Sequence, residues 1–397
     1  MLLKSDAMRG TLAYYLLYIC MGLGMGMLGP TLPSLAEQTQ TSVGQLGSLF
    51  VASSIGVVVG VTLGGRLFDR VRGHPALGVA QLIAAIAVLC VPLIPSLWLL
   101  MVVLACKGVA DGVINAGTNT LLVWTHKEKS SPFMNALHFS FGLGAFLAPF
   151  LVAQVVNIQG GYRWAYWALA VLGALAAVYL LTLKHSPQPQ HTEQTSAKAG
   201  TRIYYPLVIA ATLFLFFYVG AEIGFSGWIY TYALTLHLAD AAMAAYLTSG
   251  FWLAFTLGRL ISIPLAMRLV PQRMIAVALL GCLSVLGVAV ILPPSSTLVW
   301  IMAPVLGFCM GPIWPSGFTL AGRSLKLTAR VSGIILLGDS FGAMVLPWLV
   351  GQVLDVTGPQ ALIYLVFGSL ILNLAAFVAI LRFRQTAPDQ AAVVSAP

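Results

Sequence analysis

Four polar residues share one face of a single apolar stretch, residues 99–122. Lys107, Asp111, Asn115 and Asn119 recur at every fourth position, and a step of four residues turns a helix only ~40° past a full turn. They would therefore form one polar stripe along an apolar helix. Inside a bilayer, such residues normally face a bundle interior or a water-filled cavity. Two interpretations follow: a structural ion pair with two asparagines that bind neighbouring helices, or the polar wall of a transport cavity.

Further polar residues interrupt other apolar stretches. Glu222 lies in Gly-Ala-Glu-Ile-Gly and is interpreted equally well as a proton carrier or as a partner of a neighbouring helix. Asn135 and His138 share one helix face and are expected to form hydrogen bonds, with a sugar as one partner. Asp339 is expected to be structural, and Arg259 is expected to pair either with it or with Asp69. The residues predicted to couple an ion are Asp111, Glu222 and Lys107.

Tryptophans would matter for a sugar ligand, because the C–H faces of a pyranose stack on indole rings. Four of the nine tryptophans lie inside apolar stretches of the second half, and the others lie near predicted membrane interfaces, where tryptophan is common. Packing explains any single one of the four equally well. The predicted substrate-binding residues are Asn115, Asn119, Asn135, His138, Trp228, Trp252, Trp314 and Trp348.

Composition places these residues in a membrane protein. The 397 residues are 59% hydrophobic and 8% charged, with a mean hydropathy of +0.93, whereas a soluble domain carries about 25% charged residues. The five cysteines all lie in apolar runs without a CxxC pair, so no disulfide framework or zinc site is indicated. The predicted fold class is an all-α polytopic membrane protein with twelve transmembrane helices in two pseudo-symmetric six-helix bundles. The twelve apolar stretches are 11–35, 43–67, 75–95, 97–122, 132–156, 162–183, 204–234, 241–267, 273–292, 297–321, 331–354 and 359–381.

The basic residues predict the orientation. All of the 20 Lys and Arg residues except Arg163, Lys107 and Arg259 lie at one set of alternating loops and at the termini. By the positive-inside rule, both termini and the mid-chain linker are expected to be cytoplasmic. The net charge of +9 is then a topology signal, and no nucleic-acid partner is predicted.

An internal repeat predicts two halves. A shift of 198 positions brings Gly22, Gly26 and Gly29 onto glycines and Pro149 onto a proline, among other matches. The polar stretch 184–203, rich in Pro, Gln, Ser and Thr, has the composition of a linker. We therefore predict an N-terminal bundle in residues 1–183, a cytoplasmic linker in 184–203 and a C-terminal bundle in 204–397, the arrangement of transporters that rock two bundles about a central site.

The loop at 64–74, GGRLFDRVRGH, resembles the cytoplasmic signature of the major facilitator superfamily. It departs from the signature by one extra residue and by His74 in place of a basic pair. The resemblance implies the twelve-helix fold. Close helix approach at Gly65 and a latch formed by Asp69, Arg70 and Arg72 are expected to gate the inner side.

A finer resemblance concerns a sugar-transporting branch of that superfamily, the fucose–galactose–glucose:proton symporters and the related sodium-dependent glucose transporters. It is carried by residues 29–50, 63–70, 108–122, 135–149 and 218–232. The resemblance implies a hexose substrate and ion coupling through acidic residues on the first and fourth helices. Asp111 fits the fourth helix. The first helix has Gly24, whose mate in the repeat is Glu222.

The predicted function is secondary transport of a small polar solute, a hexose, by alternating access coupled to protons or sodium. No cofactor is expected beyond a bound proton or sodium ion, and the protein is expected to be a monomer in the inner membrane. The first alternative is efflux of amphipathic compounds or lipids, whose cavities usually have fewer hydrogen-bonding side chains. A polytopic membrane enzyme would need a catalytic His or acid pair near an interface, and a transport-dead sensor is the remaining alternative. No GxxxxGK[ST] loop is present, so direct ATP drive is not predicted.

Overall fold

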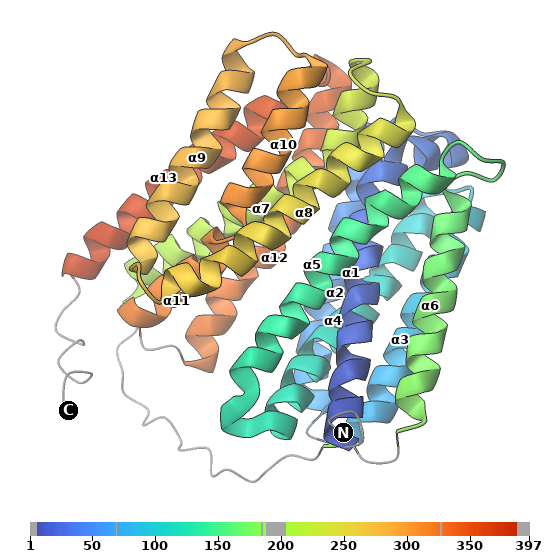
Figure 1. Cartoon of the computed structure of the whole chain (residues 1–397), viewed down its shortest axis with the longest axis vertical. Coiled ribbons are helices and arrows are strands. Elements are labelled where there is room, and N and C mark those ends of the chain that lie inside the picture. The colour runs from blue at the N-terminus through green and yellow to red at the C-terminus, as the bar shows by residue number, and fades with distance from the viewer. Residues whose placement is uncertain (1–5, 69, 184–185, 188–203, 326–327, 387–397) are drawn as a thin grey trace.

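Helices account for almost all of the structure. The computed structural model describes residues 6–68, 70–183, 186–187, 204–325 and 328–386 (Figure 1). The first half contains α1 Asp6–Thr39, η2 Gly44–Leu46, α2 Gly47–Leu67, α3 Gly73–Cys90, η3 Val91–Leu93, α4 Leu97–His126, η4 Lys127–Lys129, α5 Ser130–Val155 and α6 Arg163–Leu181. The second contains α7 Tyr205–Thr235, α8 Ala241–Ala266, α9 Pro271–Ile291, α10 Ser296–Met310, α11 Ile313–Ser324, α12 Ala329–Thr357 and α13 Ala361–Thr386.

The described helices cross the membrane twelve times. Eleven helical segments are long and apolar enough to span a bilayer. One of them, Leu97–Val155, holds two helices, α4 and α5, which the turn η4 joins. Lys127 starts that turn with a positive φ of 51°, so the chain reverses there. The all-α polytopic fold class is therefore confirmed.

One predicted helix, 297–321, is two helices in the structure. α10 ends at Met310 and α11 begins at Ile313. Pro312 stands between them as the residue before α11, and a proline cannot donate the backbone hydrogen bond that a continuous helix would need. The two pieces together cover one crossing, Ser296–Ser324.

The internal repeat reappears as pairs of equivalent glycine contacts. A Cβ on Gly60 would strike the carbonyl of Val109, and a Cβ on Gly258, its mate 198 positions later, would strike the carbonyl of Phe308. These contacts join α2 to α4 and α8 to α10. Because they leave no space for a side chain, they fix the same helix pair at the same height in both halves.

Gly65 does not take part in this packing, so the predicted close approach there is wrong. A Cβ on Gly65 would meet no heavy atom within 4 Å, whereas one on its neighbour Gly64 would lie 2.9 Å from the Ala116 Cβ. One position along a helix turns the side chain by about 100°. The packing face of α2 therefore includes Gly56, Gly60 and Gly64 and turns Gly65 away.

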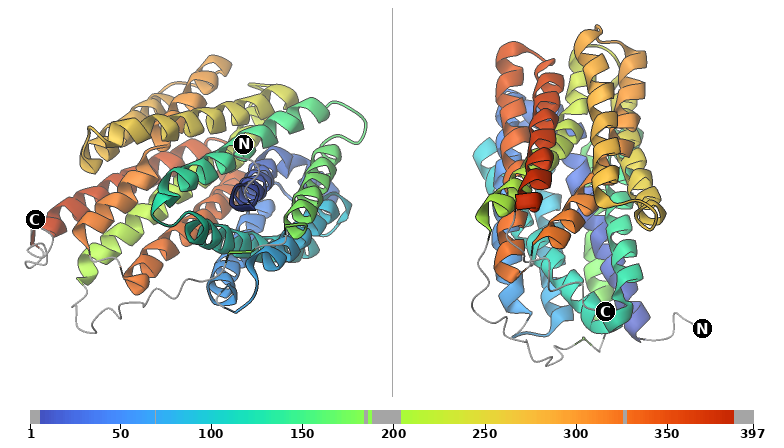
Figure 2. Two further views of the ribbon diagram at one scale, coloured as in Figure 1. Left: turned by 60° about the horizontal axis from the view of Figure 1, so that its bottom comes forward. Right: turned by 90° about the vertical axis from the view of Figure 1, so that its left-hand side faces the viewer.

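The two halves lie side by side (Figure 2) and meet at one end (Figure 1). We call this end, at which α1 finishes and α2 begins, the closed end. The opposite end, at which α1 begins and α13 finishes, is the terminus end. The hydrogen bonds by which described residues join the halves lie toward the closed end; they connect Ser42 and Gly44 to Asp355, Gly44 to Gln352, Gln154 to Tyr246, and Phe146 to Ser249.

Asp355 makes the most concentrated of these contacts. Its carboxylate accepts hydrogen bonds from the Ser42 hydroxyl and from the Gly44 backbone N–H, the latter at 3.0 Å. Gly44 begins η2, which leads directly into α2, so Asp355 of one half caps a helix start of the other. An acid at a helix N-terminus is favoured by the free N–H groups and by the helix dipole.

Candidate functional site

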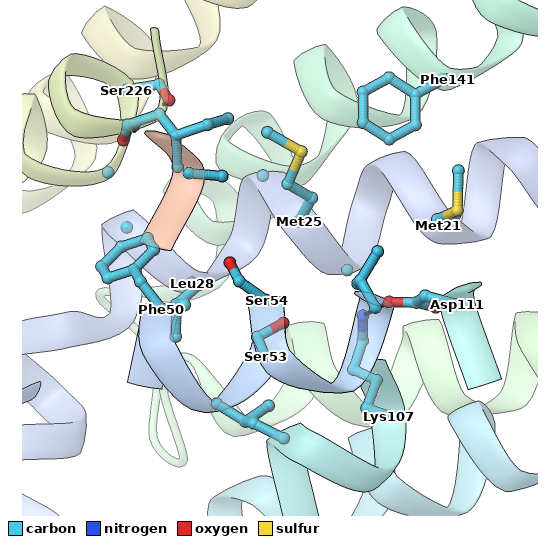
Figure 3. Close-up of a pocket in the computed structure, with 18 of the residues that line it drawn as sticks. Met21, Met25, Leu28, Phe50, Ser53, Ser54, Lys107, Asp111, Phe141 and Ser226 are labelled. Carbon is cyan, nitrogen blue, oxygen red and sulfur yellow. Dashed lines mark hydrogen bonds and ion pairs between the residues drawn. The ribbon is translucent and has the colours of Figure 1, made fainter. Parts of the chain in front are cut away.

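A cavity of about 250 Å³ lies between the halves (Figure 3). We call the hydrogen bonds that join the halves toward the closed end the seal. Gly29 and Gly227 line the cavity and also pack directly against each other, since a Cβ on Gly29 would lie 2.9 Å from the Gly227 carbonyl oxygen. The residues of the first half that line it include Met21, Gly24, Met25, Leu28, Phe50, Ser53, Ser54, Lys107, Asp111, Asn115, Phe141 and Tyr166. Those of the second half are Ile223, Ser226, Gly227, Trp252, Asp339, Ser340 and Ala343.

The Lys107–Asp111 pair is the charged centre of the first-half wall. The Lys107 ammonium donates to Asp111 at 2.5 Å, and both residues are at least nine-tenths buried. Figure 3 shows the two side chains meeting at the cavity edge. It is the one salt bridge between the residues that the structure describes. Burial of the pair makes each partner depend on the other, because a lone charge at this depth is strongly unfavourable.

Gly24 leaves room for that pair. A Cβ at Gly24 would lie 2.8 Å from the Lys107 Nζ, so any larger residue on α1 would displace the ammonium. The first helix, α1, therefore has a glycine at the position where α7 has Glu222 in the repeat. The Lys107 ammonium of α4 occupies the space beside this glycine. The charged groups of the first-half wall are thus concentrated on α4 alone.

The two asparagines of the stripe separate into different roles. Asn115 lines the cavity. Asn119, one turn further along, donates to the Tyr18 hydroxyl at 2.5 Å and to the Asn115 carbonyl at 2.8 Å. Asn119 therefore ties α4 to α1 and holds the stripe in place. It does not line the cavity, which corrects its predicted place in the binding wall.

Only one of the four predicted tryptophans lines the cavity. Trp252 is in the wall. Trp228 is fully buried and donates to the Pro347 carbonyl at 2.8 Å, which ties α7 to α12. Trp314 donates to Asp339 at 2.8 Å, and Trp348 is 40% exposed outside the cavity. The predicted aromatic wall is therefore reduced to Trp252 among these four.

The remaining predicted polar residues also lie away from the cavity lining. Asn135 is exposed, and His138 packs its ring edge-on against Tyr18, with 5.9 Å between ring centres. Glu222 is 8% exposed and lies behind the wall, within electrostatic reach of Arg259. The geometry therefore does not place Asn135, His138 or Glu222 in contact with a solute in the cavity.

The predicted gating residues lie at the terminus end. Arg70 and Arg72 are exposed. Asp69 lies outside the described residues. The contacts that join the halves instead involve Asp355 at the closed end, which was not predicted.

Several cavity residues were missed because short serines carry little signal in a sequence. Ser53 and Ser54 of α2 point toward the cavity opposite Ser226 of α7 (Figure 3). The 198-residue shift between the two halves could have identified these cavity residues. It pairs cavity positions with one another: Met25 with Ile223, Leu28 with Ser226, Gly29 with Gly227, Ser54 with Trp252 and Phe141 with Asp339.

Asp339 is the acid of the second-half wall. Its carboxylate accepts the Trp314 indole N–H, and both Arg259 and Glu222 lie within electrostatic reach of this group of residues. It was expected to be a structural partner of Arg259, yet no salt bridge joins the two, and Asp339 lines the cavity. Each half therefore places one carboxylate in the cavity wall, Asp111 and Asp339.

The lining of the cavity is suited to binding a small molecule. Among the described residues, no group of three or more His, Cys, Asp or Glu side chains is arranged to hold a metal ion. What the cavity offers is hydroxyl, carboxamide and carboxylate groups on two opposing walls, with methionines and aromatic rings between them. Such a mixture recognises a small molecule that has both hydroxyl groups and apolar faces.

Comparisons with known proteins agree with this picture. The sodium-dependent glucose transporter 1A of Mus musculus is 29% identical over 372 residues, which cover 85% of this chain and 88% of that protein. The human sodium-dependent glucose transporter 1 is also 29% identical, over 84% of this chain and 71% of its own length.

Solved structures share the fold at low identity. A bacterial homologue of the human lysosomal transporter Spinster, in an inward-facing and unoccupied conformation, gives a TM-score of 0.78 at 14% identity and covers 96% of this chain and 98% of its own. The nucleoside transporter NupG gives a TM-score of 0.71 at 15% identity, over 95% of this chain and 99% of its own. The family model of the Major Facilitator Superfamily matches residues 14–340. The chain therefore belongs to the Major Facilitator Superfamily.

Proposed function

We propose that the protein is a secondary transporter of a hexose-type sugar, driven by a cation gradient through alternating access. The observation that carries the proposal is the cavity between the halves, which is sealed at the closed end and has a carboxylate in each wall. A sugar presents several hydroxyl groups, and carboxylates, serines and Asn115 supply acceptors and donors for them. The sodium-dependent glucose transporters similar to this chain support the same substrate class.

Trp252 is the aromatic group that suits this substrate. Its ring is 1% exposed, rigidly packed between Phe251 and Phe255, and it lines the cavity. Trp252 contributes a small apolar part of the lining, beside which the ring C–H groups of a pyranose pack, and the polar groups across the cavity bind its hydroxyls. Both kinds of contact are made when the sugar lies between the halves, so its binding draws the halves together.

The Lys107–Asp111 pair suits cation coupling. Asp111 carries the one carboxylate of the first-half wall, and its charge is balanced by the ammonium 2.5 Å away. A proton or sodium ion that binds Asp111 changes this balance, and the cost of closing the cavity changes with it. Glu222, behind the opposite wall, is the second candidate carrier of a coupled proton.

Efflux of lipids or large amphipathic compounds is less compatible with the cavity. Its volume of about 250 Å³ falls slightly below the roughly 300–1,000 Å³ of sites for drug-sized ligands. The buried ion pair and the serines give it hydrogen-bonding groups that a lipid tail leaves unpaired. A monosaccharide fits both the volume and the groups.

The placement of basic residues supports an orientation with both termini in the cytoplasm. The seal then lies on the outer side, and the conformation described is inward-facing. We propose a monomer in the inner membrane, with a bound proton or sodium ion as its only non-protein component.

Uptake of radiolabelled D-glucose into proteoliposomes tests the proposal. Three conditions are compared: an inward sodium gradient, an inward proton gradient and no gradient. Accumulation above equilibrium is expected with one of the gradients, and exchange of internal for external glucose is expected without any. D-glucose is competed with other hexoses and with a nucleoside to define the class. Absence of both accumulation and exchange for every hexose would refute a sugar substrate.

A further inference from the structure

A second, much smaller cavity lies behind the Lys107–Asp111 pair. Its volume is about 10 Å³, close to the space that one water-sized group occupies. Lys107 and Asp111 line both this inner cavity and the main cavity. The ion pair therefore lies between the proposed sugar site and a small pocket lined by residues of α1, α3, α4 and α6.

Gln81 of α3 supplies the polar group of the inner cavity. It is 4% exposed and lies beside Gly173 of α6, where a Cβ would come within 2.8 Å of its Nε2. Among the described residues, none forms a hydrogen bond with its carboxamide, although it lines the same pocket as the ion pair. The carboxamide opens onto the pocket, where a water molecule or another hydrogen-bonding group can reach it.

A metal cation is a poor candidate for the group that occupies the inner cavity. A metal cation needs several oxygen ligands, and among the residues that line the inner cavity only Asp111 and Gln81 have side-chain oxygen atoms to offer. Cys20 is the only other ionisable side chain among the residues that line the inner cavity, and it offers no permanent charge. A water molecule fits this space, and among the side chains that line it the Lys107 ammonium is the one strong donor that can displace that water.

Lysine is able to make this movement. Its ammonium is a compact charge on a flexible stem with three hydrogen-bond donors, and no Cβ of α1 blocks it at Gly24. When Asp111 is neutralised by a proton or occupied by sodium, the ammonium loses its anion and needs another acceptor. The carboxamide oxygen of Gln81 is a strong acceptor within the same pocket.

We propose that the inner cavity is an alternative docking site for the Lys107 ammonium, with Gln81 as the acceptor. Lys107 is then a tethered cation that competes with the coupling cation for Asp111 and withdraws to Gln81 when that cation binds. Gln81 is a positioning residue, since it touches neither sugar nor coupling cation. This inference rests on the proposed cation coupling and assigns it an internal competitor.

The test measures the half-saturating concentration of the cation that drives glucose accumulation in the parent, sodium at fixed pH or protons at fixed sodium. Gln81→Met keeps the size but removes the acceptor, so the ammonium stays on Asp111 and the half-saturating concentration rises about tenfold. Gln81→Glu attracts the ammonium more strongly, so the same quantity falls. A merely structural role would raise it in both variants.

Lys107→Gln completes a double-mutant cycle, because the Gln81 effects should disappear once the ammonium is absent. Leu169→Met, an apolar change in the same inner cavity, is the matched control and should leave the half-saturating concentration unchanged. Equal changes in the two Gln81 variants, or Gln81 effects that persist in Lys107→Gln, would overturn the inference. A parent that shows no cation-driven accumulation would instead refute the proposed coupling, so the two failures are distinguishable.

Discussion

At the scale of single residues, the Lys107–Asp111 pair is the feature on which the proposed coupling depends. Two opposite charges on one helix, 2.5 Å apart and at least nine-tenths buried, are stable only together. They also face a cavity that contacts both halves. The same two residues can therefore serve as a structural ion pair or as a coupling site. The two interpretations differ only in what happens when Asp111 loses its charge.

Asp111→Asn separates those interpretations. The variant cannot bind a cation or exchange a proton, so accumulation driven by either gradient should be lost. Exchange of internal for external glucose, which needs no net cation movement, should persist. Both are measured in proteoliposomes with radiolabelled glucose. Full accumulation by Asp111→Asn, equal to that of the parent, would remove Asp111 from the coupling mechanism.

Trp252 and Trp348 form a matched pair for the aromatic contact. Trp252 lines the cavity and Trp348 is 40% exposed outside it. Trp252→Phe should weaken glucose binding about two- to tenfold, since an aromatic contact contributes about 0.5–1.5 kcal/mol. Trp348→Phe should leave binding unchanged. Equilibrium binding of labelled glucose to purified protein measures both, and equal affinities for the two variants would contradict the assigned contact.

At the scale of helices, glycine positions decide which helices approach closely. Gly60 of α2 meets the Val109 carbonyl of α4, and Gly258 of α8 meets the Phe308 carbonyl of α10. Five residues beyond Gly60, Gly65 faces open space. Gly60 therefore allows α2 to approach α4, whereas Gly65 makes no such contact. The difference depends only on the direction in which the glycine Cα hydrogen points.

A thermal-unfolding comparison tests this difference. Gly60→Ala forces α2 away from α4 and should destabilise the protein by about 1–3 kcal/mol, as overpacking does. Gly258→Ala should act in the same direction because it repeats the contact in the other half. Gly65→Ala should instead stabilise slightly, by up to about 1 kcal/mol, because alanine favours the helix. A lower unfolding midpoint for Gly65→Ala than for Gly60→Ala would contradict the packing described.

At the scale of the whole molecule, the two halves are joined by helix packing, chiefly of α5 with α8 and of α2 with α12, and by a few polar contacts toward the closed end. Asp355 caps the start of η2 across the interface, and Gln154 donates to the Tyr246 hydroxyl at 2.6 Å. The polar contacts add to this helix packing at the closed end. A transporter that alternates between two states needs a seal that a modest free energy can break.

Asp355→Ala should weaken the seal. Loss of a helix-capping acid costs about 1 kcal/mol, which changes the ratio of sealed to unsealed molecules about fivefold. A cysteine placed in the cavity as Ser54→Cys should then react faster with a membrane-impermeant maleimide added on the closed-end side. Glu128→Ala, an exposed acid at the terminus end, is the control and should leave that rate unchanged. An unchanged rate in Asp355→Ala would show that the capping contact does not hold the seal.

Much of this protein was predictable from its sequence, because a bilayer imposes simple constraints. Apolar length specifies the crossings, and the 198-residue shift relates the glycine contacts of α2 with α4 to those of α8 with α10. The polar stripe of α4 follows from helical periodicity alone, which fixes the face on which residues four apart must lie.

Tertiary structure alone decided which polar residues share the cavity. Asn119 and Trp228 lie on helices that border the site, and Trp314 lies on α11, yet their hydrogen bonds go to Tyr18, Pro347 and Asp339, and none of the three lines the cavity. Whether a side chain binds a neighbour or faces a cavity depends on how two helices are rotated and tilted against each other. That rotation is set by contacts between residues far apart in the chain, which no local pattern records. The pairing of Asp355 with the start of η2, and of Gln81 with the inner cavity, emerged for the same reason.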